Sequence, residues 1–419
     1  MEILSTGEKI KRSRIYQGIT LKELCGDKIS ISKMSCIENG KIKADNDILK
    51  YLSNKLNIDY NYLIRDVEDE IISNLELIRN NLIPRNELDK IIEYNFNYAV
   101  KYSYNNLAFE LIHRLFRFYV ENNKIENIQL ITSQYYEMYQ KNNNISNSII
   151  YYTDMANFFY TIKEFNESIT YYSKARELIK NNEDFDKITY SYIPYYEGKC
   201  YKKLGDMGKA YECLKEAAEY INYISDNKIK GDIYHCLANI CIRLNDDNEK
   251  KYIELFYEYK NKSPITLAFA KIKNGESYFF IKEREKAIKE IQDGIKLVPL
   301  DDNINYVRFL NKCIKILYNN GEFDYAYEII DKALNLAIDT DDIKLIEEAY
   351  YMKGMILQKK EMYSQSEMYM NLSLDALFKF ANKEKRYKRY LEMAQLYYNL
   401  GEVKESLKYF TLAMNLENN

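Results

Sequence analysis

Small side chains recur at fixed spacing from about residue 147 to the end of the chain. They form triplets with internal gaps of 12 and 7 residues, and successive triplets begin 37 to 42 residues apart. A period of this length is typical of a helical solenoid, in which each repeat is a pair of antiparallel helices. The two helices approach most closely where their side chains are small. The clearest triplets are Gly198, Ala210, Ala217; Gly275, Ala287, Gly294; Gly354, Ser366, Ser373; and Ala394, Ser406, Ala413.

Three further sets follow the same spacing with decreasing agreement. The spacing fits fully at Ala156, Ser168, Ala175. It departs at the first member in Ile314, Ala326, Ala333, and it keeps only the first member in Ala238, Lys250, Tyr257. We therefore expect about seven repeats over residues 147–419. Residues 76–141 are predicted to form irregular helical pairs, with the aromatic run at residues 115–119 in the core.

The composition favours an all-α protein. Four prolines and thirteen glycines among 419 residues are few for a β-rich or disordered chain. The N-terminus lacks the basic and apolar pattern of a signal peptide, and no apolar run could span a bilayer, so we expect a cytoplasmic protein without a membrane partner. The seven cysteines contain no C-x-x-C pair, which predicts buried, reduced thiols and neither a metal site nor a cofactor.

A second pattern lies between residues 20 and 43. A short helix that ends at Gly26 is followed by a second helix, which Ser30 or Ser32 can cap and which Gly40 ends. A helix, a tight turn and a second helix of this size are typical of domains that place side chains in the major groove of DNA.

The residues around this pattern complete a small basic domain, residues 1–65. They include a first helix over residues 7–17 and a fourth helix capped by Asp45. The domain contains twelve Lys and Arg and eight Asp and Glu, a net charge of +4, whereas the whole chain carries −3. Positive charge therefore concentrates where phosphate would bind. We predict that Lys41 and Lys43 contact phosphates.

The outward face of the second helix, expected over residues 31–39, supplies the residues predicted to enter the groove. They are Ile31, Ser32, Lys33, Cys36 and Asn39. Ser32 and Lys33 can hydrogen-bond to base edges, whereas Ile31 and Cys36 can make only apolar contacts, for instance with a thymine methyl group. This set predicts a modest specificity that tolerates A·T pairs.

The small domain resembles the helix-turn-helix domain of phage-repressor and Xre-type regulators. The matching segments are IKRSRIYQGITLKELC, ISKMSCIENGK and ILKYLSNKLNI, of which the E-N-G-K stop is the most specific. In that family an arginine of the first helix pairs with the glutamate of this stop. The resemblance therefore implies an ion pair between Arg14 and Glu38.

The repeats resemble tetratricopeptide repeats, with a period near 40 rather than 34 residues. The two parts together resemble the RRNPP family of peptide-responsive regulators. The implied architecture is all-α, with a helix-turn-helix domain at residues 1–65 and an acidic linker or the start of a connecting helix at 66–75. Irregular helical pairs follow at 76–141, and a right-handed tetratricopeptide-like solenoid that binds peptide and dimerises occupies 147–419.

The RRNPP resemblance implies a cytoplasmic transcription regulator that answers a peptide pheromone in quorum sensing and controls sporulation, virulence or competence. Its partners would be a double-stranded DNA operator, a short signalling peptide in the concave face of the repeats, and a second copy in a homodimer. Asparagine suits such a face because its side chain donates to and accepts from a peptide backbone at once. The predicted peptide-binding residues are Asn157, Asn239, Asn311, Lys199 and His235.

Two other function classes are open to a chain of this kind. One is a regulator that docks onto another protein, such as a sporulation response regulator, through its repeats. The other is an enzyme, but the two histidines, His113 and His235, lie in separate helical pairs. The chain also lacks a P-loop, G-x-S-x-G and H-E-x-x-H. We therefore predict no catalytic residues.

Overall fold

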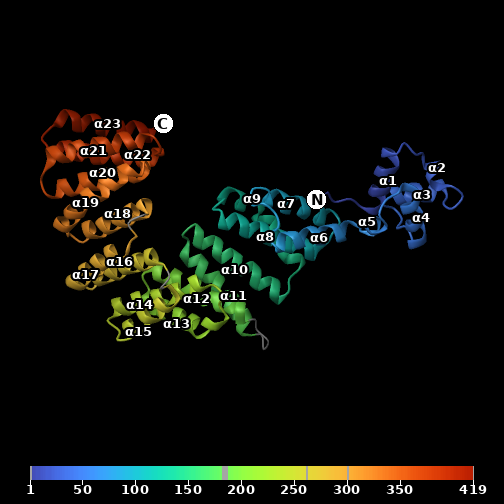
Figure 1. The fold of residues 1–419 in the computed structure, drawn as a ribbon, viewed down its shortest axis with the longest axis horizontal. Coiled ribbons are helices and arrows are strands. Elements are labelled where there is room, and N and C mark those ends of the chain that lie inside the picture. The colour runs from blue at the N-terminus through green and yellow to red at the C-terminus, as the bar shows by residue number, and fades with distance from the viewer. Residues whose placement is uncertain (1, 182–186, 261–262, 300–301, 419) are drawn as a thin grey trace. The chain divides into compact units, whose positions relative to one another are not determined.

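Helices joined by short turns make up the protein. The computed structural model describes residues 2–181, 187–260, 263–299 and 302–418, and contains no strand within these ranges (Figure 1). The chain divides into two compact units, Met1–Gly205 and Asp206–Asn419. The predicted all-α fold is confirmed over the described residues.

Five short helices form the N-terminal part of the first unit, which we call the head. They are α1 (Thr6–Tyr16), α2 (Leu21–Cys25), α3 (Ile31–Glu38), α4 (Asn46–Leu56) and α5 (Tyr60–Ile64). The head has its own apolar core, in which Leu24, Met34, Ile37, Leu52 and Leu56 are almost completely buried. This core explains why so short a set of helices can hold a defined shape, since isolated helices of this length are marginal in water.

Side-chain caps determine where the helices of the head begin. Ser5 and Thr20 each form a reciprocal capping box, with Glu8 and Glu23 respectively. The sequence left Ser30 and Ser32 as alternative caps of α3; the structure selects Ser30, whose hydroxyl accepts from the Lys33 N–H at 3.2 Å. The first helix begins and ends one residue earlier than expected.

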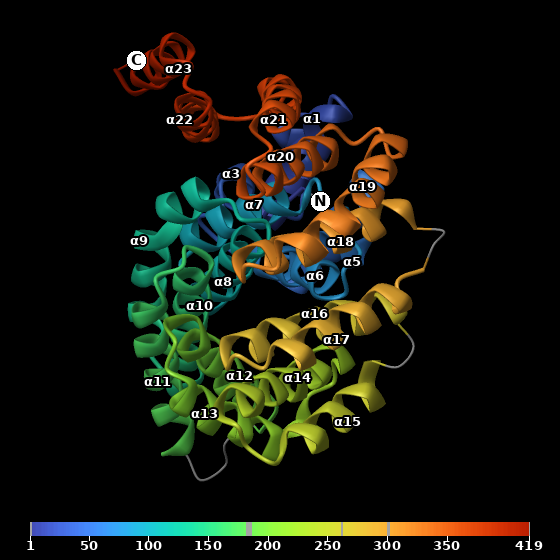
Figure 2. The same ribbon diagram turned by 90° about the vertical axis from the view of Figure 1, so that its left-hand side faces the viewer.

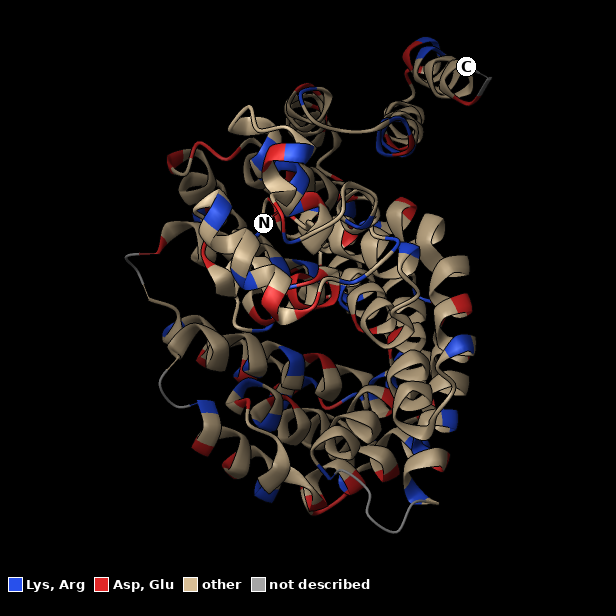
Figure 3. Ribbon diagram, turned by 90° about the vertical axis from the view of Figure 1, so that its right-hand side faces the viewer, with Lys and Arg blue, Asp and Glu red and all other residues tan. Residues whose placement is uncertain are grey.

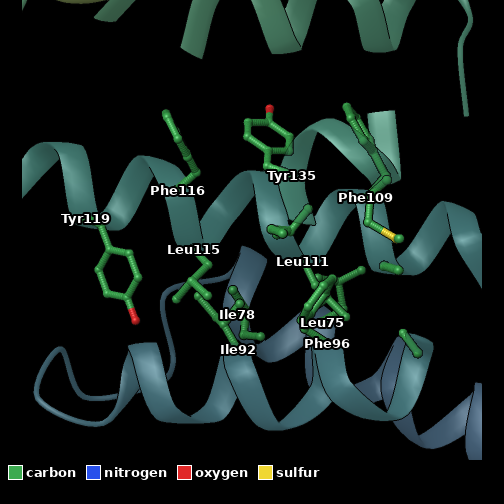
Figure 4. Packing of buried hydrophobic residues seen from close by; sticks show 14 of the residues in the cluster. Leu75, Ile78, Ile92, Phe96, Phe109, Leu111, Leu115, Phe116, Tyr119 and Tyr135 are labelled. Atoms are coloured by element: carbon green, nitrogen blue, oxygen red, sulfur yellow. The ribbon is translucent and has the colours of Figure 1, made fainter. Parts of the chain in front are cut away.

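Seven longer helices complete the first unit. They are α6 (Val67–Arg79), α7 (Leu88–Lys101), α8 (Asn105–Glu121), α9 (Ile125–Lys141), α10 (Ile145–Thr161), α11 (Phe165–Lys180) and α12 (Lys187–Leu204). Residues 66–75, expected as a linker or the start of a connecting helix, are the cap and first part of α6. Figure 4 shows how Leu75, Ile78, Ile92 and Phe96 gather between α6, α7 and α8.

The second unit continues the pattern of paired helices (Figures 1 and 2). Its elements are α13 (Met207–Glu219), η1 (Ile221–Tyr223), α14 (Asn227–Leu244), α15 (Glu249–Lys260), α16 (Pro264–Phe280), α17 (Arg284–Leu297), α18 (Asn303–Asn319), α19 (Phe323–Asp339), α20 (Ile343–Lys359), α21 (Tyr363–Phe378), α22 (Lys383–Asn399) and α23 (Val403–Asn418). Each turn between paired helices is only a few residues long, which places the two helices antiparallel and side by side.

The small residues of the triplets lie where paired helices touch. A Cβ atom added to Gly275 on α16 would come within 3.0 Å of the backbone oxygen of Ala287 on α17. Where the second member is serine, its hydroxyl also donates to the carbonyl of the first member. Ser366 donates to the oxygen of Gly354 at 2.9 Å, and Ser406 to that of Ala394 at 2.8 Å. Small side chains and, in these pairs, one side-chain hydrogen bond therefore set the distance between the helices.

Candidate functional site

The outward face of α3 is the first candidate surface. Met34 and Ile37 are buried in the core of the head, so the opposite side of the helix faces solvent. The predicted groove residues lie on that side. Ile31, Ser32 and Asn39 are exposed, and Lys33 and Cys36 are partly exposed. The Asn39 amide donates to the Ser35 carbonyl at 2.9 Å, so this side chain also caps the end of its own helix.

The end of α3 positions two exposed lysines. Gly40 adopts a φ of +70°, and its N–H donates to the Ile37 carbonyl at 3.0 Å. The Lys41 N–H donates to the Cys36 carbonyl at 2.8 Å, which completes a Schellman motif. The chain therefore leaves the helix in a defined direction, and Lys41 and Lys43 follow directly in an exposed turn.

The cations of this surface have acidic neighbours. Lys33 Nζ lies 3.6 Å from Asp45, and Lys43 Nζ lies 3.7 Å from Asp66. Figure 3 shows Lys and Arg segments interspersed with Asp and Glu segments on the head. Both pairs are long and solvent-exposed, and exposed pairs contribute roughly 0–1 kcal/mol. The lysine side chains can therefore turn toward a phosphate at little cost.

An ion pair fixes α1 to the end of α3. Arg14 Nε donates to one carboxylate oxygen of Glu38 at 2.6 Å, and a terminal nitrogen donates to the other at 2.9 Å. A further nitrogen of Arg14 donates to the Ile19 carbonyl at 3.1 Å. The Glu38 side chain is only 3% exposed. The hydrogen bond to Glu38 raises the pKa of Arg14, and the two-point contact holds α3 in its orientation relative to α1.

A cavity of about 750 Å³ separates this part of the head from the helices that follow. Asn39 and Lys43 line one side, and Asp66, Tyr102 and Tyr104 line the other. The Tyr102 and Tyr104 rings stack with centroids 6.1 Å apart. Sequence reasoning missed these tyrosines, because nothing in their spacing distinguishes them from the many other tyrosines of the chain.

The two peptide-binding candidates of the first unit lie near the same two tyrosines, Tyr160 and Tyr196. Asn157 on α10 lines a cavity of about 230 Å³ together with Asp154, Tyr160 and Tyr196. Lys199 Nζ lies 5.9 Å from the ring centres of both Tyr160 and Tyr196. The Tyr172 hydroxyl donates to the Asn157 side-chain oxygen at 2.6 Å, which leaves the amide nitrogen of Asn157 as its donor.

A buried carboxylate adjoins the same cavity. Asp154, 3% exposed, lies 2.6 Å from Nδ1 of His113 and accepts from the Tyr135 hydroxyl at 2.7 Å. Burial, and then the neighbouring Asp154 charge, raise the pKa of Tyr135 well above its usual value, so the phenol remains a donor. Sequence reasoning missed Asp154, since its partners lie 19 and 41 residues away on other helices.

The sequence predicts that the peptide-binding candidates of the second unit lie on an open concave face, but in the structure they are buried. His235 and Asn239 on α14 are buried, and both reach Asn274 on α16: the Asn239 amide donates to its side-chain oxygen at 2.9 Å, and His235 Nε2 lies 3.2 Å away. Asn311 on α18 is 1% exposed and donates to Glu348 at 3.2 Å. Its own side-chain oxygen accepts no hydrogen bond from any described residue.

Within the described ranges, no three His, Cys, Asp or Glu side chains converge in a way that could hold a metal ion. Likewise, none of the described helices has the length and apolarity to cross a bilayer. None of the seven cysteines, all of which the structure describes, forms a disulfide; Cys36 is partly exposed and the other six are buried.

Comparison with known sequences finds the tetratricopeptide repeat at residues 197–222 and 387–419. The TPR repeat-containing protein MJ1428 of Methanocaldococcus jannaschii is 24% identical over 261 residues, which are 52% of this chain and 43% of that protein. The chain thus spans less than half the length of this curated relative.

Three solved structures are similar at low identity. The apo form of the quorum sensor NprR from B. thuringiensis is 16% identical, covers 84% of this chain and all of its own, and has a TM-score of 0.49. The apo form of RapI is 14% identical over 84% of this chain and 97% of its own, with a TM-score of 0.49. PlcR of Bacillus thuringiensis, in complex with the peptide PapR7 and DNA, is 16% identical over 61% and 94%, with a TM-score of 0.36.

The matched tetratricopeptide segments agree with the paired helices of the second unit.

Proposed function

We propose that this chain is a transcription regulator that binds DNA as a homodimer through α3 of the head and answers a short peptide bound by its helical repeats. The observation that carries the proposal is the exposed face of α3, ended by a glycine cap and followed directly by two exposed lysines. The net charge of +4 on residues 1–65 supports it.

The size of α3 suits a major groove. An α-helix with its side chains is about 10–12 Å across, and the major groove of B-DNA is about 12 Å wide, so a short helix such as α3 can lie in it. Ser32 and Lys33 lie on the face that would meet base edges, and Lys41 and Lys43 lie where the helix end would approach the phosphate backbone. The Arg14–Glu38 pair keeps α3 in one orientation while it binds.

Dimerisation follows from the small number of base-reading side chains. One head with so few contacts binds weakly, whereas two heads on a dimer gain specificity from half-sites spaced about 34 Å apart or a multiple of it. A peptide that prefers one curvature of the repeats would shift the population of dimers toward one spacing of the heads.

The cavity beside Asn157 is our proposed peptide site in the first unit. The Asn157 amide and the Lys199 ammonium supply donors toward peptide carbonyls, and Tyr160 and Tyr196 supply apolar walls. In the second unit, Asn311 has an acceptor that a ligand donor could satisfy. His235 and Asn239 already bond to α16, so we propose that they set the packing of the repeats and influence a peptide only indirectly.

The test is DNA binding by the full chain in a mobility-shift assay, with a random duplex pool at low salt. The Lys41→Glu/Lys43→Glu variant is expected to lose about 100-fold in affinity, since it replaces two phosphate contacts by repulsion. The Lys50→Glu/Lys55→Glu variant, which changes the same charge on exposed residues of α4, is the control. Equal loss in both variants, or no binding by the natural chain, would refute the proposal.

Alkylation of Cys36 gives an independent readout. It is the one partly exposed cysteine of the seven, so a thiol reagent should modify it first. Duplex DNA is expected to slow this modification in the natural chain and to leave it unchanged in the Lys41→Glu/Lys43→Glu variant. Protection that persists in the variant would show that DNA covers some other part of the head.

A second candidate function is docking onto another protein, and one observation favours it. Ile31 and Ile42 are 50% and 46% exposed beside the lysines, and exposed apolar side chains suit a protein partner. The Lys41→Glu/Lys43→Glu variant separates the two functions in the native host. Regulation that survives the loss of DNA binding supports protein docking, for instance with a response regulator.

A further inference from the structure

A basic segment lies in the second unit, where α21 ends and α22 begins. Residues 379–389 contain six Lys or Arg and one Glu, a net charge of +5, whereas the whole chain carries −3. The exposed or partly exposed cations of this segment are Lys379, Lys383, Lys385, Arg386 and Lys388. The exposed Lys344 of α20 adjoins the same turn, since its Nζ lies 5.9 Å from the ring centre of Phe380. We call these six cations the α22 patch.

The charge of the α22 patch is only partly neutralised by the rest of the fold. Lys388 pairs with Glu384 at 2.7 Å. Among the residues that the structure describes, no carboxylate pairs with Lys379, Lys383 or Lys385. The neighbouring turn, residues 339–344, contains three Asp and one Lys, a net charge of −2, so the two turns together still carry +3.

Three of these cations stand at the end of α22 that least favours them. Asn382 caps the helix, so Lys383, Lys385 and Arg386 belong to its first four residues. The backbone N–H groups give this end of a helix a partial positive charge, and Lys or Arg there destabilises the helix unless an anion is bound. Within the described ranges, the N–H groups of Lys383 and Glu384 donate to no acceptor. The arrangement therefore weakens α22 by itself and suits a bound anion.

Aromatic rings position two of the cations. The Arg386 guanidinium lies 5.2 Å from the ring centre of Phe378, and one of its nitrogens donates to the Phe378 carbonyl at 2.9 Å. Lys344 lies over Phe380 in the same way. Arg386 Nε is buried and donates to no described residue. A buried donor without an acceptor is costly, and an oxygen of a bound phosphate would satisfy it.

We propose that the α22 patch binds the sugar–phosphate backbone of double-stranded DNA, which gives the second unit a nucleic-acid contact of its own. Five of the six cations are lysines, which meet phosphates as point charges and read no sequence. A duplex offers the densest row of such charges, one per about 1.7 Å of its axis. Phe378 and Phe380 already hold cations, so they do not form a platform for the unstacked bases of a single strand. This contact goes beyond the proposed function and does not depend on α3.

The experiment measures binding of the full chain to a random-sequence duplex by fluorescence anisotropy, between about 50 and 200 mM salt. All proteins carry Lys41→Glu/Lys43→Glu, so that the head contributes little. Addition of Lys379→Gln/Lys383→Gln/Lys385→Gln should weaken binding at low salt at least about 10-fold. It should also reduce the slope of log K against log salt by about 2–3, since three phosphate contacts are lost.

The matched control adds Lys289→Gln/Lys315→Gln/Lys359→Gln, which removes the same charge from exposed lysines elsewhere in the second unit. It should leave the slope almost unchanged. The patch variant should unfold at the same or a higher temperature than its parent, because the charges that it removes oppose the helix dipole. Unchanged binding in the patch variant, or equal losses in the patch and control variants, would overturn the proposal.

Two competitors test the assignment to duplex DNA. Polyglutamate that displaces the duplex as readily as unlabelled duplex of equal charge would assign the α22 patch to an acidic protein instead. Tighter binding of a single strand with the same number of phosphates would likewise contradict the proposal. A failure of the proposed function is distinguishable, because Lys41→Glu/Lys43→Glu would then leave the DNA affinity of the natural chain unchanged.

Discussion

At the scale of single residues, the head depends on charges that are buried with their partners. Glu38 is nearly inaccessible and receives two hydrogen bonds from Arg14, which itself reaches the Ile19 carbonyl. A lone buried charge is far more costly than a buried pair, because desolvation is then uncompensated. The stability of the head should therefore depend on the pair as a unit.

Removal of one partner of the Arg14–Glu38 pair should lower the free energy of unfolding more than removal of both partners. Arg14→Ala is expected to lower the free energy of unfolding by about 3 kcal/mol, and Arg14→Ala/Glu38→Gln by less. Chemical denaturation followed by circular dichroism measures both. As a control, Lys388→Ala in the exposed pair with Glu384 should change little. A double variant less stable than Arg14→Ala would contradict the buried-pair account.

A second charge cluster predicts pH dependence. Glu110 on α8 accepts from Arg79 at 2.9 and 2.6 Å and from Arg114 at 3.0 Å. Burial raises the pKa of Glu110, but the two arginines outweigh it and the pKa lies below its usual value. Since the folded pKa is lower than the unfolded value of about 4.3, the cluster stabilises the fold above that pH. The stabilisation disappears as pH falls through the folded pKa.

Glu110→Gln should therefore cost about 1 kcal/mol of stability at pH 7 and much less near pH 3, since the arginines are partly exposed. Denaturant titrations of both proteins at the two pH values measure the difference. Glu137→Gln, in the exposed pair with Lys141, should show no such pH dependence. A penalty that stays constant down to pH 3 would mean that the Glu110 charge does not stabilise the fold.

At the scale of helices, the second unit depends on small residues where paired helices meet. Among the triplet glycines Gly275, Gly294 and Gly354, the last, on α20, is the most tightly packed: an added Cβ atom would lie 2.7 Å from Cγ and 2.8 Å from Sδ of the buried Met370 on α21. Glycine is otherwise a poor helix residue, by about 1 kcal/mol relative to alanine. Close packing, and not helix propensity, therefore accounts for glycine at this position.

Two glycine-to-alanine variants should change stability in opposite directions. Gly354→Ala is expected to destabilise the protein by about 1–2 kcal/mol, because overpacking outweighs the gain in propensity. Gly208→Ala on α13 should be neutral or stabilising, since the nearest atom to its added Cβ is 3.8 Å away. Thermal unfolding of both variants measures the contrast. Stabilisation by both changes would show that the helices yield without cost.

At the scale of the whole molecule, side-chain contacts as well as the covalent backbone join the head to the rest of the first unit. The Lys9 ammonium, 3% exposed, donates to the Tyr62 carbonyl at 3.0 Å, the Arg65 carbonyl at 2.8 Å and Glu70 at 2.6 Å. Ile3 is completely buried in the core of the helices that follow the head. These contacts restrain the head against α6, so a change of shape in those helices would reach α3.

Lys9→Met tests this restraint, because it keeps the side-chain stem and removes the three hydrogen bonds. Amides near residues 62–70 are expected to exchange hydrogen at least about 10-fold faster, since Glu70 and two carbonyls lose their donor. Lys11→Met, an exposed residue of the same helix, should leave that exchange unchanged. Unchanged exchange in Lys9→Met would show that the head is held by the chain connection and Ile3 alone.

Local features followed from the sequence. The glycine ends of the helices and the spacing of small residues each depend on a few neighbouring residues. They predicted the ends of α1, α2 and α3 within a residue or two, the start of α4 at its Asp45 cap, and the repeats as helix pairs. The alternation of buried Met34 and Ile37 with outward residues on α3 follows from the helical period alone. These features depend on backbone geometry that a short segment determines by itself.

Contacts between distant helices were decided only by the tertiary structure. Asn157 and Lys199 lie near the same two tyrosines, His113 and Tyr135 meet Asp154, and His235 and Asn239 turn toward α16. Each of these depends on how two helices cross and on which rotamers the packing allows. Spacing along the chain carries no information about a crossing angle. The sequence by itself therefore determined which helices form and which faces are apolar, and packing decided which polar side chains meet.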